Sequence, residues 1–105
     1  TTDTAAALRA LEISADLLMM SKNDVDGVYD SDPKINPKAK KIDNISHLDA
    51  LSKQIRALDS TALSMCMDNN VPISVFNIFD KGSLSGILGG NKIGTLITND
   101  GEGVI

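Results

Sequence analysis

This sequence of 105 residues has few of the residues that build aromatic cores, disulfides and membrane-spanning helices. Aromatic side chains make up only 3% of it and tryptophan is absent, so the core must consist of aliphatic side chains. Cys66 is the single cysteine, which excludes an internal disulfide and is compatible with a reducing cytosol. Because no run of about 18 apolar residues occurs, we expect no membrane span.

An excess of positive charge is also absent. The chain has 14 acidic and 10 basic residues, and its formal net charge is −4 at pH 7. Surfaces that bind nucleic acid or anionic membranes need the opposite balance, so we expect neither partner. A small anionic ligand remains compatible with this composition, because backbone N–H groups at a helix N-terminus hold phosphate even in an acidic protein.

The first forty residues predict a helix, a buried strand and a long polar loop. Thr2 or Asp3 can cap a helix, and apolar residues then recur at helical spacing. The stripe at this spacing consists of Ala5, Leu8, Leu11 and Ala15. Residues 17–20 form an apolar run typical of a strand buried on both faces. Residues 22–41 are rich in Asp, Asn, Lys, Gly and Pro and predict a loop with turns.

The remaining residues predict helices behind caps at Ser46 and Asp59, strands at 73–79 and 94–98, and a short helix at 84–88. Three strands separated by helices indicate parallel pairing and a layered α/β fold. Such a narrow sheet leaves one edge open. The chain also starts without Met and enters a helical pattern at once, so we expect a piece of a longer chain.

Two residues that often carry chemistry are interpreted as structural. The helix behind Ser46 has an apolar stripe, and His47 falls on its opposite side, so we expect His47 at the surface. That stripe consists of Leu48, Leu51, Ile55 and Leu58. Cys66 lies on an apolar helix face and is expected in the core. The sequence offers no base and no second cysteine that would make Cys66 a nucleophile or a zinc ligand, so we assign no metal ligand.

The loop that follows the first strand is the best candidate for a ligand site. Ligands of open α/β sheets bind outside the carboxyl ends of the strands, and this loop holds the only tyrosine. Tyr29 could stack on a base, Asn23 could hydrogen-bond to a base or sugar, and Asp32 could accept from a ribose hydroxyl. A polar turn with one exposed tyrosine explains the same residues.

A second candidate is the start of the chain, residues 1–4. Hydroxyl groups and backbone N–H groups at a helix start form a natural phosphate cradle. Asp3 could orient catalytic lysines or a metal ion. The alternative is an ordinary helix N-cap.

Five blocks of the sequence can be compared with known families: TTDTAAALRA at residues 1–10, KNDVDGVYDSDP at 22–33, DSTA at 59–62, PISVFN at 72–77 and GTLI at 94–97. They resemble the bacterial-type uridylate (UMP) kinases of the amino-acid-kinase superfamily. They occur in the family's order and cover nearly the whole chain. The DGVYxxDP pattern alone is specific only to the superfamily, whereas its combination with the first and fourth blocks points to UMP kinases.

The resemblance implies the C-terminal, nucleotide-binding part of an amino-acid-kinase domain over residues 1–105, with the N-terminal half absent. The implied fold is a three-layer αβα sandwich with a mostly parallel sheet. The implied parent enzyme transfers the γ-phosphoryl group of ATP to UMP with Mg²⁺, giving UDP and ADP. It would be a cytoplasmic homohexamer that serves pyrimidine nucleotide synthesis.

Residue by residue, the resemblance places two substrates on this chain. Thr1 and Thr2 match the end of the UMP-binding segment, and Asp3 matches an active-site aspartate that organises phosphoryl transfer. The positions that contact ATP in the family correspond to Asn23, Tyr29 and Asp32. Asp59 matches an aspartate near the nucleotide, and a helix cap explains it equally well.

The family's N-terminal lysine/glycine loop and its early UMP-binding residues are absent from this chain. Phosphoryl transfer depends on positioning and charge neutralisation, so we expect the 105 residues alone to be inactive. Three alternatives stay open: a non-catalytic nucleotide-binding or storage module of the same fold, another amino-acid kinase, or an α/β domain without a ligand.

Overall fold

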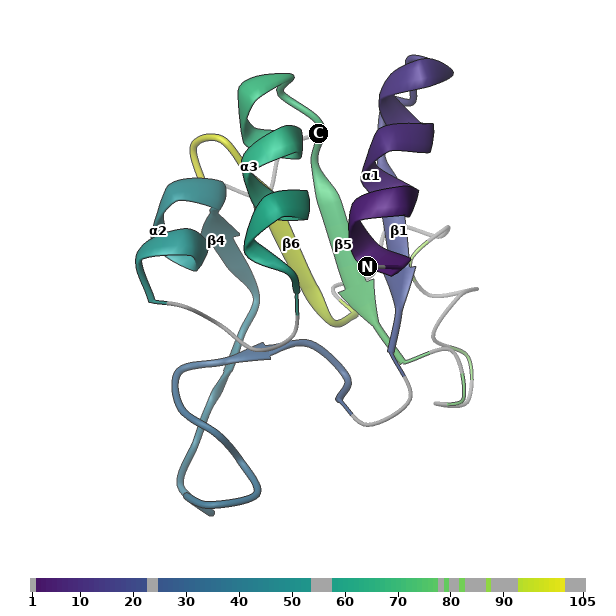
Figure 1. The fold of residues 1–105 in the computed structure, drawn as a ribbon. Coiled ribbons are helices and arrows are strands. Elements are labelled where there is room, and N and C mark those ends of the chain that lie inside the picture. The colour runs from purple at the N-terminus through teal and green to yellow at the C-terminus, as the bar shows by residue number, and fades with distance from the viewer. Residues whose placement is uncertain are drawn as a thin grey trace.

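A computed structural model describes residues 2–22, 25–53, 58–77 and 93–101, together with residues 79, 82 and 87. Within the described residues, one helix is followed by four strands, two helices and two further strands, arranged as Figure 1 shows. In chain order they are α1 (Thr2–Glu12), β1 (Leu18–Ser21), β2 (Val28–Tyr29), β3 (Lys41–Ile42), β4 (Asn44–Ser46), α2 (His47–Ser52), α3 (Ser60–Asp68), β5 (Ile73–Phe76) and β6 (Thr95–Thr98). None of these described helices is long and apolar enough to cross a membrane.

The main sheet has the strand order β1-β5-β6-β4. β1 pairs with β5 in parallel and β4 pairs with β6 in parallel, whereas β5 and β6 are antiparallel. All three predicted strands exist, but the expectation of parallel pairing throughout is wrong at β5 and β6. Val75 pairs with Thr95, so β6 enters the sheet at the end where β5 leaves it. β4 was not predicted. Two of the three pairings are parallel, which agrees with the expected mostly parallel α/β sheet.

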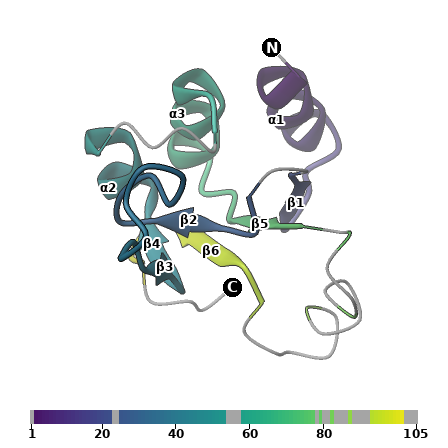
Figure 2. The ribbon, with the colours of Figure 1, turned by 90° about the horizontal axis from the view of Figure 1, so that it is seen from below.

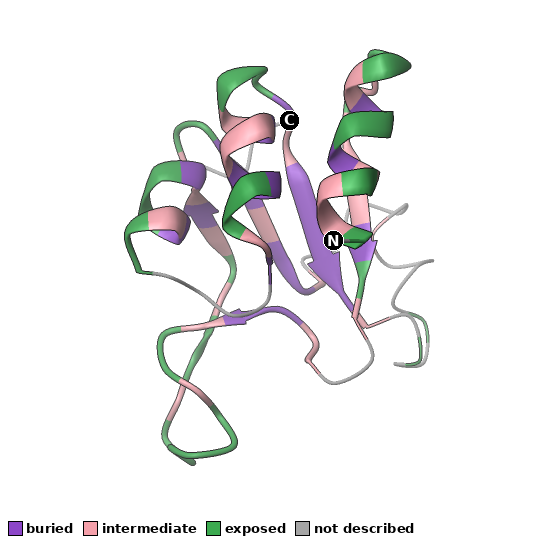
Figure 3. Ribbon diagram, in the orientation of Figure 1, coloured by how far each residue is buried: buried purple, intermediate pink, exposed green. Residues whose placement is uncertain are grey.

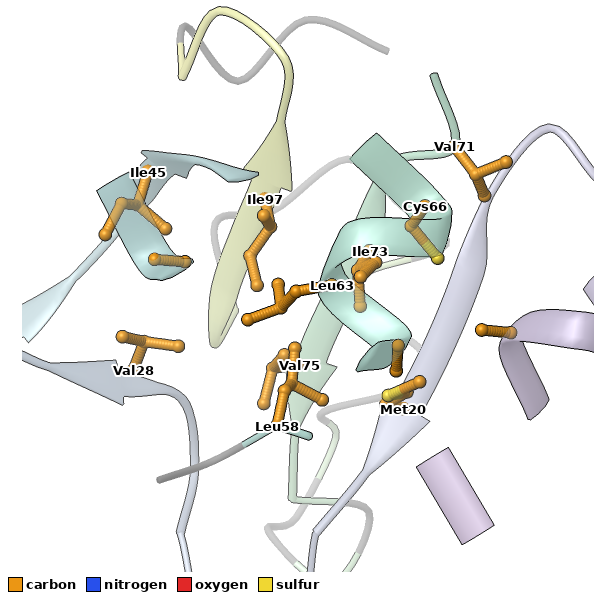
Figure 4. Close-up of a cluster of buried hydrophobic side chains, with 13 residues drawn as sticks. Met20, Val28, Ile45, Leu58, Leu63, Cys66, Val71, Ile73, Val75 and Ile97 are labelled. Carbon is orange, nitrogen blue, oxygen red and sulfur yellow. The ribbon is translucent and has the colours of Figure 1, made fainter. Parts of the chain in front are cut away.

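The three described helices α1, α2 and α3 lie on one face of this sheet (Figure 2). Between them and the sheet lies an aliphatic core, in which Leu63 of α3 points toward the strands (Figure 4). As the composition required, the largest fully buried core side chains come from Leu, Ile and Val. They include Leu63, Ile73, Ile97, Val28 and Val75. Cys66 is buried among them, as predicted.

Helix α1 buries mainly small residues, and from the predicted stripe Leu11 is partly buried and packs against the core. Ala7 and Ala10 are buried, whereas Leu8 is 50% exposed. Helical periodicity alone does not say which of two apolar faces meets the sheet. Alanine lets a helix approach its neighbours closely, and here α1 packs beside α3 and over β1.

Helix α2 begins behind Ser46, as predicted, because the Ser46 side chain accepts a hydrogen bond from the backbone N–H of Asp49. The expected surface position of His47 is wrong: this side chain is fully buried and Leu48 is 62% exposed. His47 Nε2 lies 2.9 Å from the carbonyl oxygen of Val71, which can only accept, so Nε2 donates. His47 Nδ1 is buried and has no hydrogen-bond partner among the described residues.

The predicted loop over residues 22–41 contains a short antiparallel ribbon, in which β2 pairs with β3. Neither strand has the length or the apolar alternation that signals a strand in a sequence. The ribbon lies across one end of the main sheet, and a largely exposed turn projects from it (Figures 1 and 3). The helix predicted at 84–88 lies outside the described residues except for residue 87, and the tail does so beyond residue 101.

Candidate functional site

Polar groups gather at the end of the sheet where the ribbon lies. The carboxyl ends of β1 and β5 and the N-termini of α1 and α3 all point to this end (Figure 1). Carboxyl ends of strands are where open α/β sheets bind ligands. Helix N-termini add unpaired N–H groups and a partial positive charge, which favour anions.

Asp3 in the first turn of α1 is held by two partners from distant parts of the chain. Its Oδ1 accepts from Lys22 Nζ at 2.8 Å, and its Oδ2 accepts from the backbone N–H of Asp59 at 3.1 Å. Only 19% of the Asp3 side chain and 22% of the Lys22 side chain are exposed. Such a cation and such a donor stabilise a partly buried carboxylate by charge-assisted hydrogen bonds.

Asp59 links this pair to the third helix. Its Oδ1 accepts from the backbone N–H of Thr61 at 3.0 Å, so Asp59 caps α3 as predicted. Its Oδ2 accepts from the hydroxyl of Thr4 at 2.5 Å. Asp3, Thr4, Lys22 and Asp59 therefore form one connected set, which we call the carboxylate network.

Tyr29 anchors a second set on the ribbon. Its hydroxyl donates to Asp26 Oδ1 at 2.7 Å, and Lys41 Nζ lies 3.6 Å from Asp26 Oδ2. Burial tends to raise the pKa of the Asp26 carboxyl, but the Tyr29 hydrogen bond and the Lys41 charge outweigh that effect and hold the pKa below its ordinary value. We call Asp26, Tyr29 and Lys41 the ribbon network.

Asp32 lies in the turn that projects beyond the ribbon. Its Oδ1 accepts from the backbone N–H of Lys34 at 2.9 Å, and its carbonyl oxygen accepts from the N–H groups of Ile35 and Asn36. These are the contacts of an Asx-type turn. These contacts agree with the explanation of Asp32 as a turn residue. The hypothesis that Asp32 accepts from a ribose hydroxyl stays a prediction.

The structure brings together some of the predicted site residues. Asp3 and Asp59 are linked directly. Tyr29 lies on the ribbon and Asp32 on its turn, while Thr2 is exposed at the start of α1. The other two predicted residues, Thr1 and Asn23, lie outside the described residues.

Sequence reasoning missed the partners of these residues. In the sequence Lys22 is only the first residue of a polar loop. Its place directly after the first strand is the available signal that it lies at the ligand-binding end of the sheet. Nothing local indicates that Thr4 meets Asp59, because 55 positions separate them. Lys22 and Asp26 lie four positions apart, so both networks are anchored on the segment that leaves β1.

The carboxylates of this end do not fit a magnesium site formed by the protein. Both oxygens of Asp3 and both oxygens of Asp59 already accept hydrogen bonds. Over the described ranges, no three His, Cys, Asp or Glu side chains group as metal ligands. We therefore assign no magnesium ligand to these residues and derive no step through the ion.

Comparison with known proteins identifies the family to which this chain belongs. The family model described as "Amino acid kinase family" matches residues 1–77. The chain belongs to the amino acid kinase family. The match contains α1, β1, the ribbon and β5, and hence both polar networks.

Individual members of the amino acid kinase family resemble the chain closely. It is 52% identical over 101 residues to a uridylate kinase of Deinococcus radiodurans, covering 96% of this chain and 41% of that protein. A UMP kinase structure from Bacillus anthracis superposes with a TM-score of 0.90 at 38% identity, covering 95% of this chain and 41% of that one. The UMP kinase from Ureaplasma parvum gives 0.83 at 42% identity, with coverages of 93% and 42%.

These likenesses confirm the fold class as the mixed α/β architecture of UMP kinase structures, with a mostly parallel sheet. The chain spans about 41% of the length of the relatives named first.

Proposed function

We propose that the complete protein containing these residues is a UMP kinase, which transfers the γ-phosphoryl group of ATP to UMP and yields UDP and ADP. The observation that carries the proposal is Asp3, held between Lys22 and the N-terminus of α3 at the carboxyl end of β1. The 52% identity to a uridylate kinase over 101 residues supports the choice of acceptor.

The carboxylate network would serve the transfer step. Phosphoryl transfer has little covalent chemistry for a protein to perform, so catalysis comes from positioning and charge stabilisation. Asp3 would fix the Lys22 ammonium group at the sheet end, beside two helix N-termini that favour phosphate. Asp59 would keep Asp3 in place through its backbone N–H group.

The ribbon network would serve ATP binding. With its hydroxyl held by Asp26, the Tyr29 ring has a defined position from which it can border the adenine base. Asn23 and Asp32 would contact the same nucleotide, with Asp32 accepting from the ribose. For this contact the Asp32 carboxylate must accept a hydrogen bond from the ribose in addition to the one from the backbone N–H of Lys34.

The acceptor side would be completed by Thr1 and Thr2, next to Asp3 in the sequence, with UMP placed over the start of α1. ATP would bring Mg²⁺ on its phosphates, where the ion neutralises charge. The lysine/glycine loop of the family would come from the rest of the protein. We propose that residues 1–105 form the ATP-binding part of the domain and are inactive alone.

By the same family relation, we propose that the complete protein is a homohexamer, is cytoplasmic and supplies UDP for pyrimidine nucleotide synthesis. Light scattering of the purified complete protein tests the assembly. A mass near six subunits is expected, and a monomer would contradict this part of the proposal.

The decisive assay measures ADP formation by the complete protein with ATP and one acceptor at a time. UMP should give much faster turnover than CMP, and faster turnover than glutamate, aspartate or carbamate. Equal or faster turnover with an amino acid or carbamate would identify another amino-acid kinase. ATP binding without UMP-dependent turnover would instead identify a nucleotide-binding module.

A further inference from the structure

The side chain of Thr95 joins the main sheet to the ribbon. Thr95 is the first residue of β6 and is fully buried. Its Oγ1 accepts from the backbone N–H of Val28 at 2.8 Å and donates to the carbonyl oxygen of Ile42. Val28 and Ile42 pair with each other across β2 and β3. One hydroxyl group of the main sheet therefore holds both strands of the ribbon.

Two glycines make this junction very close. A Cβ atom on Gly27 would lie 2.8 Å from Thr95 Oγ1. A Cβ atom on Gly94 would lie 2.0 Å from the carbonyl oxygen of Val75, and Gly94 has a φ of +70°, which other residues rarely adopt. The ribbon therefore lies close to the start of β6, and neither glycine position has room for a Cβ atom.

The ribbon network lies within one residue of this junction. Asp26 precedes Gly27, Tyr29 follows Val28, and Lys41 precedes Ile42. Rotation or lifting of the ribbon at Thr95 would move all three side chains. It would also break the hydrogen bonds of the Thr95 hydroxyl group to the backbone of Val28 and Ile42, the first of them buried, which opposes such movement.

We propose that Thr95 is a positioning residue for adenine-nucleotide binding: its hydroxyl fixes the ribbon and so sets where Tyr29 meets the base. This inference rests on the proposed function, because it takes ATP as the ligand. It assigns a role to a fully buried residue that lies 66 positions after Tyr29 in the chain.

The test uses the complete protein and three variants. Thr95→Val keeps the branched shape but removes the hydroxyl, Thr95→Ser keeps the hydroxyl, and Thr98→Val is the matched control. Thr98 is a buried threonine on the same strand whose hydroxyl bonds Asp100 and Gly101 instead of the ribbon. The readouts are the equilibrium Kd for ATP, the KM for UMP, and the thermal unfolding midpoint.

We expect Thr95→Val to raise the Kd for ATP about tenfold, the change that corresponds to the loss of one buried hydrogen bond. The KM for UMP should stay unchanged, and Thr95→Ser should restore ATP binding. Thr98→Val should lower the unfolding midpoint and leave the Kd for ATP as it was. A purely structural role for Thr95 predicts the same behaviour for both valine variants, which would overturn the inference.

Two further measurements keep the inference testable. If Thr95→Val does not fold, Gly27→Ala approaches the junction from the ribbon side and should raise the Kd for ATP in the same way; an unchanged Kd would overturn the inference. Failure of the wild-type protein to bind ATP would overturn the proposed function. Amide exchange at Val28 would then decide about the junction, since Thr95→Val should accelerate it and unchanged exchange would refute the role of Thr95.

Discussion

The carboxylate network and the ribbon network lie at the same end of the sheet, but they are built differently. The carboxylate network joins α1, the end of β1 and the start of α3, and every carboxylate oxygen in it accepts a hydrogen bond. The ribbon network lies within residues 26–41, and its Asp26 and Lys41 side chains are 36% and 33% exposed. The first is fixed by the packing of three elements, whereas the second depends on how one ribbon rests on the sheet.

This difference matches the division of labour that we propose. A transfer step needs groups held within a fraction of an ångström, which a network tied to three elements can provide. A nucleotide must enter and leave, which an exposed ribbon at the edge of the core permits. The predictions below test this division, beginning with the variant from which we expect the largest effect.

Substitution of Asp3 should give the largest effect. Asp3→Asn removes the charge that holds Lys22, so we expect kcat of the complete protein to fall about 10²–10³-fold, as when one oriented catalytic group is lost elsewhere. The KM for ATP should change little, because the ribbon is untouched. Steady-state kinetics with both substrates checks this, and Asp16→Asn, an exposed aspartate, is the control. A large rise in the KM for ATP would break the division.

Asp59 separates capping from the network. Asp59→Ala removes the α3 cap and should lower the free energy of unfolding by about 1 kcal/mol. Asp59→Asn keeps a capping oxygen and should restore most of that stability. Urea unfolding of both variants measures the difference. If Asp59→Asn is as unstable as Asp59→Ala, the charge toward Thr4 matters more than the cap.

Tyr29→Phe should act on the other network. It removes the hydroxyl that donates to Asp26, so the ring loses one constraint, and the Kd for ATP should rise roughly three- to tenfold. kcat should stay near the wild-type value. Equilibrium titration with ATP gives the first quantity and saturating turnover gives the second. A fall in kcat without a change in Kd would assign Tyr29 to the transfer step.

Acid should weaken the ribbon network slightly. The pKa of Asp26 is lowered in the folded chain, so its contribution to stability is complete above the unfolded pKa, about 3.9, and is lost as pH falls through the folded pKa. Asp26→Asn should flatten the decline of the urea midpoint below about pH 4. Lys41→Met should flatten it in part, because the Lys41 charge helps to lower that pKa. An unchanged pH profile in Asp26→Asn would contradict this cause.

The elements with local signals could be predicted from the sequence. Ser46 and Asp59 cap helices because their side chains bond N–H groups two or three residues ahead. β5 is an apolar run whose four residues are all buried, whereas the apolar run predicts the position of β1 but not its burial, since only Met20 of β1 is buried. Asp3 and Tyr29 are candidates by residue type and position, but turn and cap explanations fit them equally well, and only the family resemblance favours the functional interpretation.

Features that depend on distant partners could not be predicted. The ribbon is only two residues deep on each strand, and its position depends on Thr95, 67 positions from Val28. His47 can be buried because the carbonyl oxygen of Val71, 24 positions away, accepts a hydrogen bond from its ring. Lys22 gained a role only when the structure placed Asp3 beside it. In each case the deciding atom lies beyond the reach of a local pattern.

The division between the two networks is tested most directly with two variants of the complete protein, Asp3→Asn and Tyr29→Ala. For each variant, kcat and the KM for ATP are measured under the same conditions with UMP as acceptor. We predict that Asp3→Asn lowers kcat and spares the KM for ATP, and that Tyr29→Ala raises the KM for ATP and spares kcat. If both variants change the same parameter to the same extent, or if the wild-type protein forms no ADP in response to UMP, the account is contradicted.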